Sequence, residues 1–196
     1  STGIAYSMDG VNVADPEGGS AWVFSDYNVI EEAKVMGIGL PAEYGNFTGV
    51  IFNLITKSGG NQISGHFEAD YQGKSKFFVN DNNDAYIDDF PELSAPKSEL
   101  MDFSGHLGGP VMKDKLWFYV GLQYYRTKDF PTGFAEASDY KQPHSFFKLT
   151  SQISPSTNLS ASVQVDTYNG DNRAVFGFEH TQLSLDTTLT QKSTEV

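Results

Sequence analysis

The chain has 196 residues, a formal net charge of −12 and a pI near 4.5. It therefore lacks the clustered basic face of nucleic-acid-binding proteins, and we expect no nucleic-acid partner. It contains no cysteine, which excludes a cysteine nucleophile, a thiolate zinc site and a disulfide framework. Glycine (19 residues) and aromatic residues (14%) are frequent, as in β-rich chains with many turns.

The first 60 residues carry mixed signals. Ile4–Val13 is predicted to form a strand interrupted by a turn at Asp9 and Gly10. Gly49–Thr56 is apolar and rich in β-branched residues, which predicts a buried strand.

Between these strands the sequence predicts a short helix. Asp26–Lys34 begins with a good N-cap residue, Asp26, and carries Glu31 and Glu32 near its start. The helical pattern ends at Val35.

After Gly60 the sequence alternates strictly between apolar and polar residues. Side chains alternate sides in a strand, so each such segment predicts a strand with one apolar and one polar face. The five apolar faces consist of Ile63, Gly65, Phe67, Ala69 and Tyr71; Met101, Phe103, Gly105 and Leu107; Leu116, Phe118, Val120, Leu122 and Tyr124; Phe147, Leu149 and Ile153; and Leu159, Ala161, Val163, Val165 and Thr167.

The connections between these segments alternate in length. Long polar stretches are predicted at Gly73–Ser98, at Lys128–Pro143 and after Tyr168, and tight turns at Met112–Lys115 and Ser154–Asn158. This alternation is typical of outer-membrane barrels, which have short periplasmic turns and longer outside loops.

Two environments fit the apolar faces equally well, lipid and a protein core. No segment approaches the ~20 apolar residues of a transmembrane helix, whereas a barrel strand spans a membrane with ~9–11 residues. The aromatic residues Trp117 and Phe118, and Tyr124 and Tyr125, lie near opposite ends of one strand. They fit either two membrane-interface girdles or cross-strand packing.

Several segments resemble the TonB-dependent outer-membrane receptors, in particular the Oar-like subgroup. The end of that family's plug domain resembles Tyr6–Val13, Val29–Val35, Pro41–Gly45 and Gly49–Gly59, and its second barrel turn resembles Leu107–Val111 with Lys113–Phe118. The block from Tyr44 to Lys57 is the most specific part. The residues that carry the plug motif are Asp9, Gly10, Glu31, Tyr44, Gly45, Gly49, Asn53, Thr56, Lys57 and Gly59.

The resemblance implies a mainly β fold: the end of an α+β plug domain followed by antiparallel transmembrane strands of a partial barrel. We expect residues 1–60 to be the C-terminal part of the plug and residues 61–196 the first five to six barrel strands. The chain would then be a fragment, because full members of the family also have an energy-coupling box, a complete plug and about 22 strands.

The resemblance also implies function. It predicts a transporter in the bacterial outer membrane that takes up a scarce nutrient such as a siderophore, a glycan or a peptide. Its partners would be outer-membrane lipid, an inner-membrane energy-coupling protein, the small-molecule or peptide ligand, and other chains if these complete the barrel. The alternative is a soluble or surface β-sheet binding module without transport. No catalytic motif is recognisable, so we expect no enzyme.

Candidate ligand-binding residues are few. Asp81, Asn83, Asp84 and Asp88 form an oxygen-rich segment that could bind calcium in an extracellular loop, although its spacing is not that of an EF-hand and a solvated loop is the simpler interpretation. Asp166, Asn169, Asp171 and Asn172 form a similar, weaker cluster. No other cofactor is expected.

His66 and His106 lie on the polar faces of neighbouring predicted strands. They would meet in a symmetric hairpin and could bind a metal, although a pair of polar residues without metal is the commoner outcome. Three plug residues, Glu31, Glu32 and Glu43, are further candidates for contacts with the barrel wall. The alternative is that these side chains are simply solvated.

Overall fold

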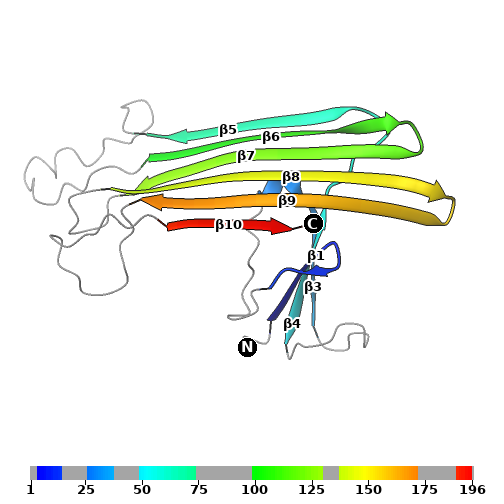
Figure 1. Ribbon diagram of the computed structural model, residues 1–196, viewed down its shortest axis with the longest axis horizontal. Coiled ribbons are helices and arrows are strands. Elements are labelled where there is room, and N and C mark those ends of the chain that lie inside the picture. The colour runs from blue at the N-terminus through cyan, green and yellow to red at the C-terminus, as the bar shows by residue number, and fades with distance from the viewer. Residues whose placement is uncertain are drawn as a thin grey trace, which may run out of the picture.

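A computed structural model describes residues 4–14, 26–37, 49–73, 99–129, 137–171 and 189–195. These residues form two β-sheets, one of four strands and one of six (Figure 1). No helix in these ranges has the length and apolar character needed to cross a membrane.

The four-stranded sheet has the order β2-β1-β4-β3. Its strands are β1 (Ile4–Met8), β2 (Val11–Asn12), β3 (Ile30–Met36) and β4 (Val50–Thr56). The predicted turn between β1 and β2 is present, and both of its residues have positive φ, 48° at Asp9 and 87° at Gly10. These values suit the tight turn of a two-residue hairpin. The predicted strand Gly49–Thr56 is also present as β4, which pairs with β1 in parallel and with β3 antiparallel.

The predicted helix over Asp26–Lys34 is wrong beyond its first turn. Asp26 does cap a turn, since its carboxylate accepts a hydrogen bond of 2.8 Å from the Asn28 amide, but the turn is a 3-10 helix of three residues, Tyr27–Val29. From Ile30 onward the chain forms β3 and pairs with β4. The ladder with β4 provides backbone hydrogen bonds that a short exposed helix could not match in stability.

The six-stranded sheet is an antiparallel meander in which every strand pairs with its neighbours in sequence. Its strands are β5 (Ser64–Gln72), β6 (Glu99–Met112), β7 (Leu116–Asp129), β8 (Ser138–Ser154), β9 (Thr157–Asp171) and β10 (Leu189–Glu195). The two tight turns, at residues 113–115 and 155–156, lie at the same end of the sheet (Figure 1).

The strands extend further than the sequence indicated. The predicted loop Lys128–Pro143 is too long, because β7 continues to Asp129 and β8 already begins at Ser138. Polar residues are retained in the ladder here because they pair across it, as Arg126 does with Asp139 through two hydrogen bonds. β9 likewise continues past Tyr168 to Asp171.

The six-stranded sheet is apolar on its free face and polar on the face that is covered. We call the face that contacts the four-stranded sheet the inner face, and the opposite one the outer face. Exposed on the outer face are Phe67, Phe103, Leu107, Leu122, Tyr124, Phe147, Val163 and Val165, whereas Ser104, His106, Gln123, His144, Lys148, Gln164 and Asp166 are buried on the inner face. This is the inverse of a soluble sandwich. Among the described residues no part of the protein packs on the apolar face, so this face does not form a protein core.

The aromatic residues divide between the two faces. By the same alternation Phe118 and Tyr124 lie on the outer face, and Trp117 and Tyr125 on the inner face. Each predicted girdle pair therefore contributes one outward ring.

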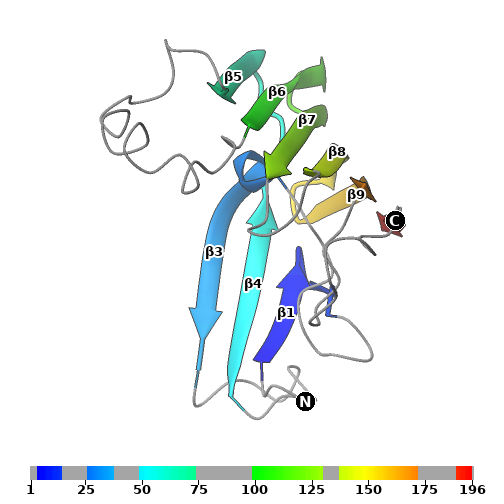
Figure 2. The same cartoon turned by 90° about the vertical axis from the view of Figure 1, so that its left-hand side faces the viewer.

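The two sheets meet where β3 begins and β4 ends (Figure 2). Val29 is 1% exposed and packs with Tyr119 and Phe146, which form a small core with Ile30 at its edge. The rest of this contact is polar, and it contains the candidate site.

Candidate functional site

The first part of the site joins the β1–β2 turn to the inner face of β8. Lys148 is 7% exposed. Its ammonium group donates hydrogen bonds of 2.8 Å to Asp9 Oδ2, 2.8 Å to Thr56 Oγ1 and 3.3 Å to the Thr56 carbonyl oxygen. An ammonium group has three donor protons, so these acceptors satisfy it fully.

The conformation of the turn brings Asp9 into this position. With φ at 48°, Asp9 directs its carboxylate to the end of β4, where it accepts hydrogen bonds from the Thr56 amide and hydroxyl groups. Burial opposes ionisation of this carboxyl group, but the hydrogen bonds from Lys148 and Thr56 more than offset it, and the pKa of Asp9 lies below its ordinary value of 3.8. Asp9 is therefore a carboxylate at neutral pH.

A second buried pair joins the 3-10 turn to β6. Asp26 Oδ2 lies 2.7 Å from His106 Nε2, and both side chains are almost fully buried. The other Asp26 oxygen accepts the Asn28 amide proton, so one carboxylate both caps the turn and holds it to the six-stranded sheet, which we call the wall. The rings of His66 and Tyr119 stack on either side of His106, with centroids 6.5 Å and 6.3 Å away.

The tip of the 3-10 turn fits a gap in the sheet. A Cβ atom on Gly121 would lie 2.6 Å from Val29 Cγ1, so only glycine leaves room for Val29. Beside it, the Asn28 amide group donates to Glu68 at 3.1 Å and to Ser104 at 3.4 Å. The turn is thus attached to β5, β6 and β7 at once.

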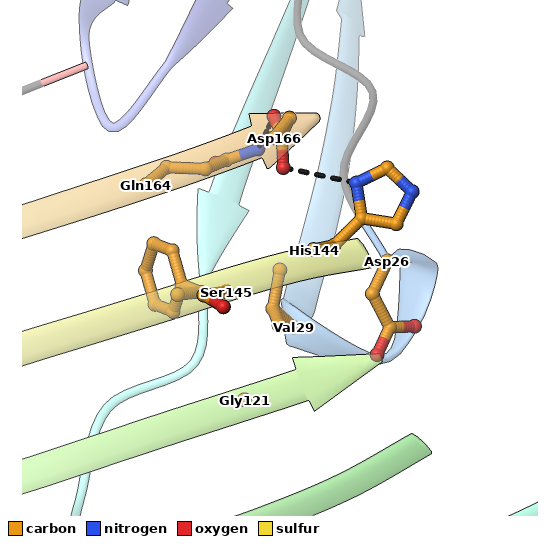
Figure 3. Close-up of a pocket in the computed structure, with 8 residues that line it drawn as sticks. Asp26, Val29, Gly121, His144, Ser145, Gln164 and Asp166 are labelled. Atoms are coloured by element: carbon orange, nitrogen blue, oxygen red, sulfur yellow. Dashed lines mark hydrogen bonds and ion pairs between the residues drawn. The ribbon is translucent and has the colours of Figure 1, made fainter. Parts of the chain in front are cut away.

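A third polar cluster lies next to this turn on β8 and β9. Figure 3 shows His144 and Asp166 beside a small pocket of about 10 Å³ that Asp26, Val29 and Gly121 also line. His144 Nδ1 lies 3.0 Å from Asp166 Oδ1, and the Gln164 amide donates to Asp166 Oδ2 at 2.7 Å. A larger pocket of about 200 Å³ is lined by Asn28 of the turn together with Lys57, His66 and Tyr119.

The connector from β4 to β5 is also fixed to the sheet. A Cβ atom on Gly59 would overlap the Phe118 carbonyl oxygen and lie 2.9 Å from that of Gly109. Asn61 donates to Asp114 at 2.6 Å and accepts from Trp117 Nε1 at 2.8 Å, which ties the connector to the tight turn before β7. The backbone of the connector therefore lies directly against the six-stranded sheet at Gly59, whereas a Cβ on Gly60 would meet nothing within 4 Å.

The structure places the plug-motif residues as follows. Asp9, Gly10, Thr56, Lys57 and Gly59 lie at or next to the contact between the sheets, and the Lys57 amide donates to the Val29 carbonyl. Gly49 lies just before β4, and Asn53 within it accepts a hydrogen bond from Ser7 at 2.9 Å. Tyr44, Gly45 and Glu43 lie outside the described residues.

The two glutamates proposed as wall contacts are exposed on β3. Glu31 and Glu32 follow the turn, and Glu32 lies 3.4 Å from Lys34. The carboxylates that join the wall are instead those of Asp9 and Asp26.

The candidate metal ligands have different outcomes. Asp81, Asn83, Asp84 and Asp88 lie outside the described residues, as does Asn172. His66 and His106 do face each other directly across β5 and β6, but His106 Nε2 is occupied by Asp26. Across the described ranges, three or more His, Cys, Asp or Glu side chains are nowhere grouped as a metal would require.

The structure separates Asp166 from the other described members of the weaker acidic cluster on β9, Asn169 and Asp171. Asp166 lies on the inner face with His144, whereas Asp171 lies on the outer face, 3.3 Å from Lys141. Alternation along a strand separates residues at odd and even positions.

Sequence reasoning missed Lys148, Asp26 and His144 as members of the contact. The signal for Lys148 was present, since it is a charged residue between Phe147 and Leu149 on a predicted spanning strand. Its partners lie more than 90 residues away in sequence, which no local pattern could identify.

Comparison with known proteins agrees with the resemblance found in the sequence. No family model matches the chain. The TonB-dependent transporter Oar of Myxococcus xanthus is 30% identical over 122 residues, which cover 60% of this chain and 11% of that protein. The crystal structure of the siderophore receptor PirA from Acinetobacter baumannii matches 87% of this chain and 24% of that chain, with a TM-score of 0.58 and 16% identity, and so shows the fold alone.

The chain thus spans a small part of each of these proteins. An Oar-like sequence match and a receptor fold point to the same type of protein. The chain is similar to a segment of a TonB-dependent outer-membrane transporter in sequence and to part of a siderophore receptor in fold.

Proposed function

We propose that this chain is the plug–wall junction of an outer-membrane transporter that imports a scarce nutrient into the periplasm. Residues 1–60 would belong to the plug and residues 61–196 would be the first strands of the barrel. The observation that carries the proposal is the inverted wall, which is apolar on its free face and whose buried side chains Lys148 and His106 contact the carboxylates of Asp9 and Asp26. Transport proteins of this type are not enzymes.

The junction has the chemistry that such a transporter needs. A plug must close the barrel and yet detach, so a purely apolar contact is unsuitable. Here Val29 supplies a small apolar anchor. Asp9 with Lys148 and Asp26 with His106 supply polar contacts, which water can replace once the turn moves away from the wall.

The long connections of the wall lie opposite its tight turns, at the end where β6 begins and β7 and β9 end. In the proposed transporter this end faces the cell exterior and contributes to ligand capture. An inner-membrane energy-coupling protein would then pull the plug. Siderophores, glycans and peptides are the ligand classes that we propose to test.

The test uses the full-length gene in its own host. We expect its deletion to abolish growth on one nutrient from a panel of iron chelates, glycans and peptides supplied as the sole source. Loss of the energy-coupling protein should give the same defect, and the protein should fractionate with the outer membrane and need detergent for extraction.

A protein that is released in soluble form without detergent would contradict this proposal and support the alternative, a binding module. Growth of the deletion strain on every nutrient of the panel that the wild type uses would also contradict the proposal.

A further inference from the structure

We propose that charged residues on the outer face of the wall bind the phosphate-bearing headgroups of outer-leaflet lipids. The inference rests on the proposed function, because the outer face meets lipid only if the six-stranded sheet is a barrel wall. It concerns two neighbouring rows, which we call the charged rows: Glu99, Lys128, Asp139 and Asp171, and next to them Arg126 and Lys141.

Strand register places the charged rows side by side. Glu99 pairs with Lys128, Lys128 with Asp139, and Asp139 with Asp171, so that one row crosses four strands. Arg126 pairs with Lys141 in the next row. Alternation puts all six on the same face as Tyr124 and Leu122.

Ion pairs hold the cations of the charged rows in place. Arg126 donates two hydrogen bonds to Asp139, of 2.9 Å from Nε and 2.6 Å from Nη2. Lys141 lies 3.3 Å from Asp171 and 3.6 Å from Asp139. The side chains of Arg126 and Lys141 remain 29% and 37% exposed, so each cation is oriented and still accessible.

The charged rows end abruptly at an uncharged belt. Toward the tight turns, the outer faces of β5 to β9 carry no Asp, Glu, Lys or Arg. From Phe103 to Val111 this belt covers eight residue steps, about 27 Å along the strand. At the usual tilt of barrel strands the belt is about 20 Å high, which suits the hydrocarbon layer. The charged rows therefore lie at headgroup height, at the end with the long connections.

This position favours a lipid headgroup over a free anion. Phe103 and Tyr124 lie on the outer face next to Arg126 and Lys141, on the side of the uncharged belt. They are 40% and 41% exposed and could contact the acyl chains of a lipid whose phosphate is bound to the two cations. The guanidinium and ammonium groups suit phosphate oxygens. The carboxylates Asp139 and Asp171 suit the divalent cations that bridge neighbouring phosphates.

The experiment uses the full-length protein, purified in detergent from outer membranes. Bound phosphorylated lipid is measured by mass spectrometry, and binding of added lipid A is titrated with and without magnesium. Three variants are compared with the wild type: R126Q/K141Q in the charged rows, D139N/D171N in the same rows, and K113Q/K115Q at the opposite end. The last is the matched control, since it also removes two cations.

We expect R126Q/K141Q to bind lipid A roughly 30-fold more weakly, about fivefold for each cation removed, and K113Q/K115Q to bind it like the wild type. D139N/D171N keeps both cations and should bind at least as well as the wild type, with less dependence on magnesium. Inorganic phosphate should compete only weakly, because it lacks acyl chains.

Two results would overturn the inference. Equal binding by R126Q/K141Q and its control would show that the cations do not contact the headgroup. Equal losses in R126Q/K141Q and D139N/D171N would show that the charges serve only to pair with each other. Failure of the proposed function is distinguishable, because the protein would then be missing from the outer-membrane fraction before any lipid is measured.

Discussion

Lys148 illustrates how a single buried charge can hold two parts of a chain together. Removing an ammonium group from water costs several kcal/mol, which a single partner in a buried site rarely offsets. Here the ammonium group has three acceptors from two elements, the β1–β2 turn and the end of β4. Lys148 is the buried member of the pair, so loss of the Asp9 charge would leave its ammonium group with only the two Thr56 oxygens as acceptors.

This pair should make the junction sensitive to acid. The pKa of Asp9 is below 3.8 in the folded protein, so its contribution to stability is complete above that pH and is lost as the pH falls through the lower, folded value. We expect D9N to lower the thermal stability of the full-length protein by roughly 1–2 kcal/mol at neutral pH. The difference in melting temperature between wild type and D9N should stay constant down to about pH 4 and then shrink.

The exposed Glu32 provides the control for this experiment. E32Q should change the melting temperature little at any pH, because surface ion pairs contribute little. A difference between wild type and D9N that does not shrink at all as the pH falls below 3.8 would show that the charge of Asp9 is not what stabilises the contact.

The 3-10 turn at Tyr27–Val29 is one of the elements that attach the four-stranded sheet to the six-stranded sheet. It contacts β5 through Asn28, β6 through Asp26 and β7 through Val29. The position of Val29 depends on the missing side chain of Gly121, since a Cβ atom there would lie 2.6 Å from Val29 Cγ1. A change of one atom in the wall should therefore displace the whole turn.

We expect G121A to loosen this turn and G105A to be tolerated. A Cβ at position 121 meets Val29 at 2.6 Å, whereas a Cβ at position 105 meets the Phe67 ring at an ordinary 3.8 Å. Hydrogen exchange of peptides covering residues 26–37 should accelerate in G121A alone. The double variant V29A/G121A should recover part of the protection, because it removes the methyl group that collides. Equal exchange in G121A and G105A would contradict this account of the turn.

At the scale of the whole molecule, local patterns predicted the strands of the wall and its faces well. Strict alternation identified β5 to β9, because the outward and inward positions of these strands meet such different surroundings. Alternation could not distinguish lipid from a core, since both select the same residues. That choice required the position of the four-stranded sheet, which contacts the polar side.

Long-range contacts were the part that the sequence could not provide. The pairs Asp9 with Lys148 and Asp26 with His106 join residues 139 and 80 positions apart, and each depends on how two sheets meet. The helix expected at Asp26–Lys34 failed for the same reason. Asp26 was correctly predicted as the N-cap, but the residues from Ile30 onward form a strand because they pair with β4.

The inverted wall yields a test that separates a barrel from a soluble sheet. Ala161 and Ser160 are adjacent, small and exposed in β9, but Ala161 lies on the outer face and Ser160 on the inner face. In a membrane, A161K would place an ammonium group in hydrocarbon and should cost roughly 2–4 kcal/mol, whereas S160K should cost little because its side chain points toward a wet interior. The measurement is the yield and the urea-unfolding midpoint of the full-length protein folded into lipid vesicles. A soluble sheet would tolerate both lysines equally, since both positions would then face water, and that result would contradict the placement of the outer face in lipid.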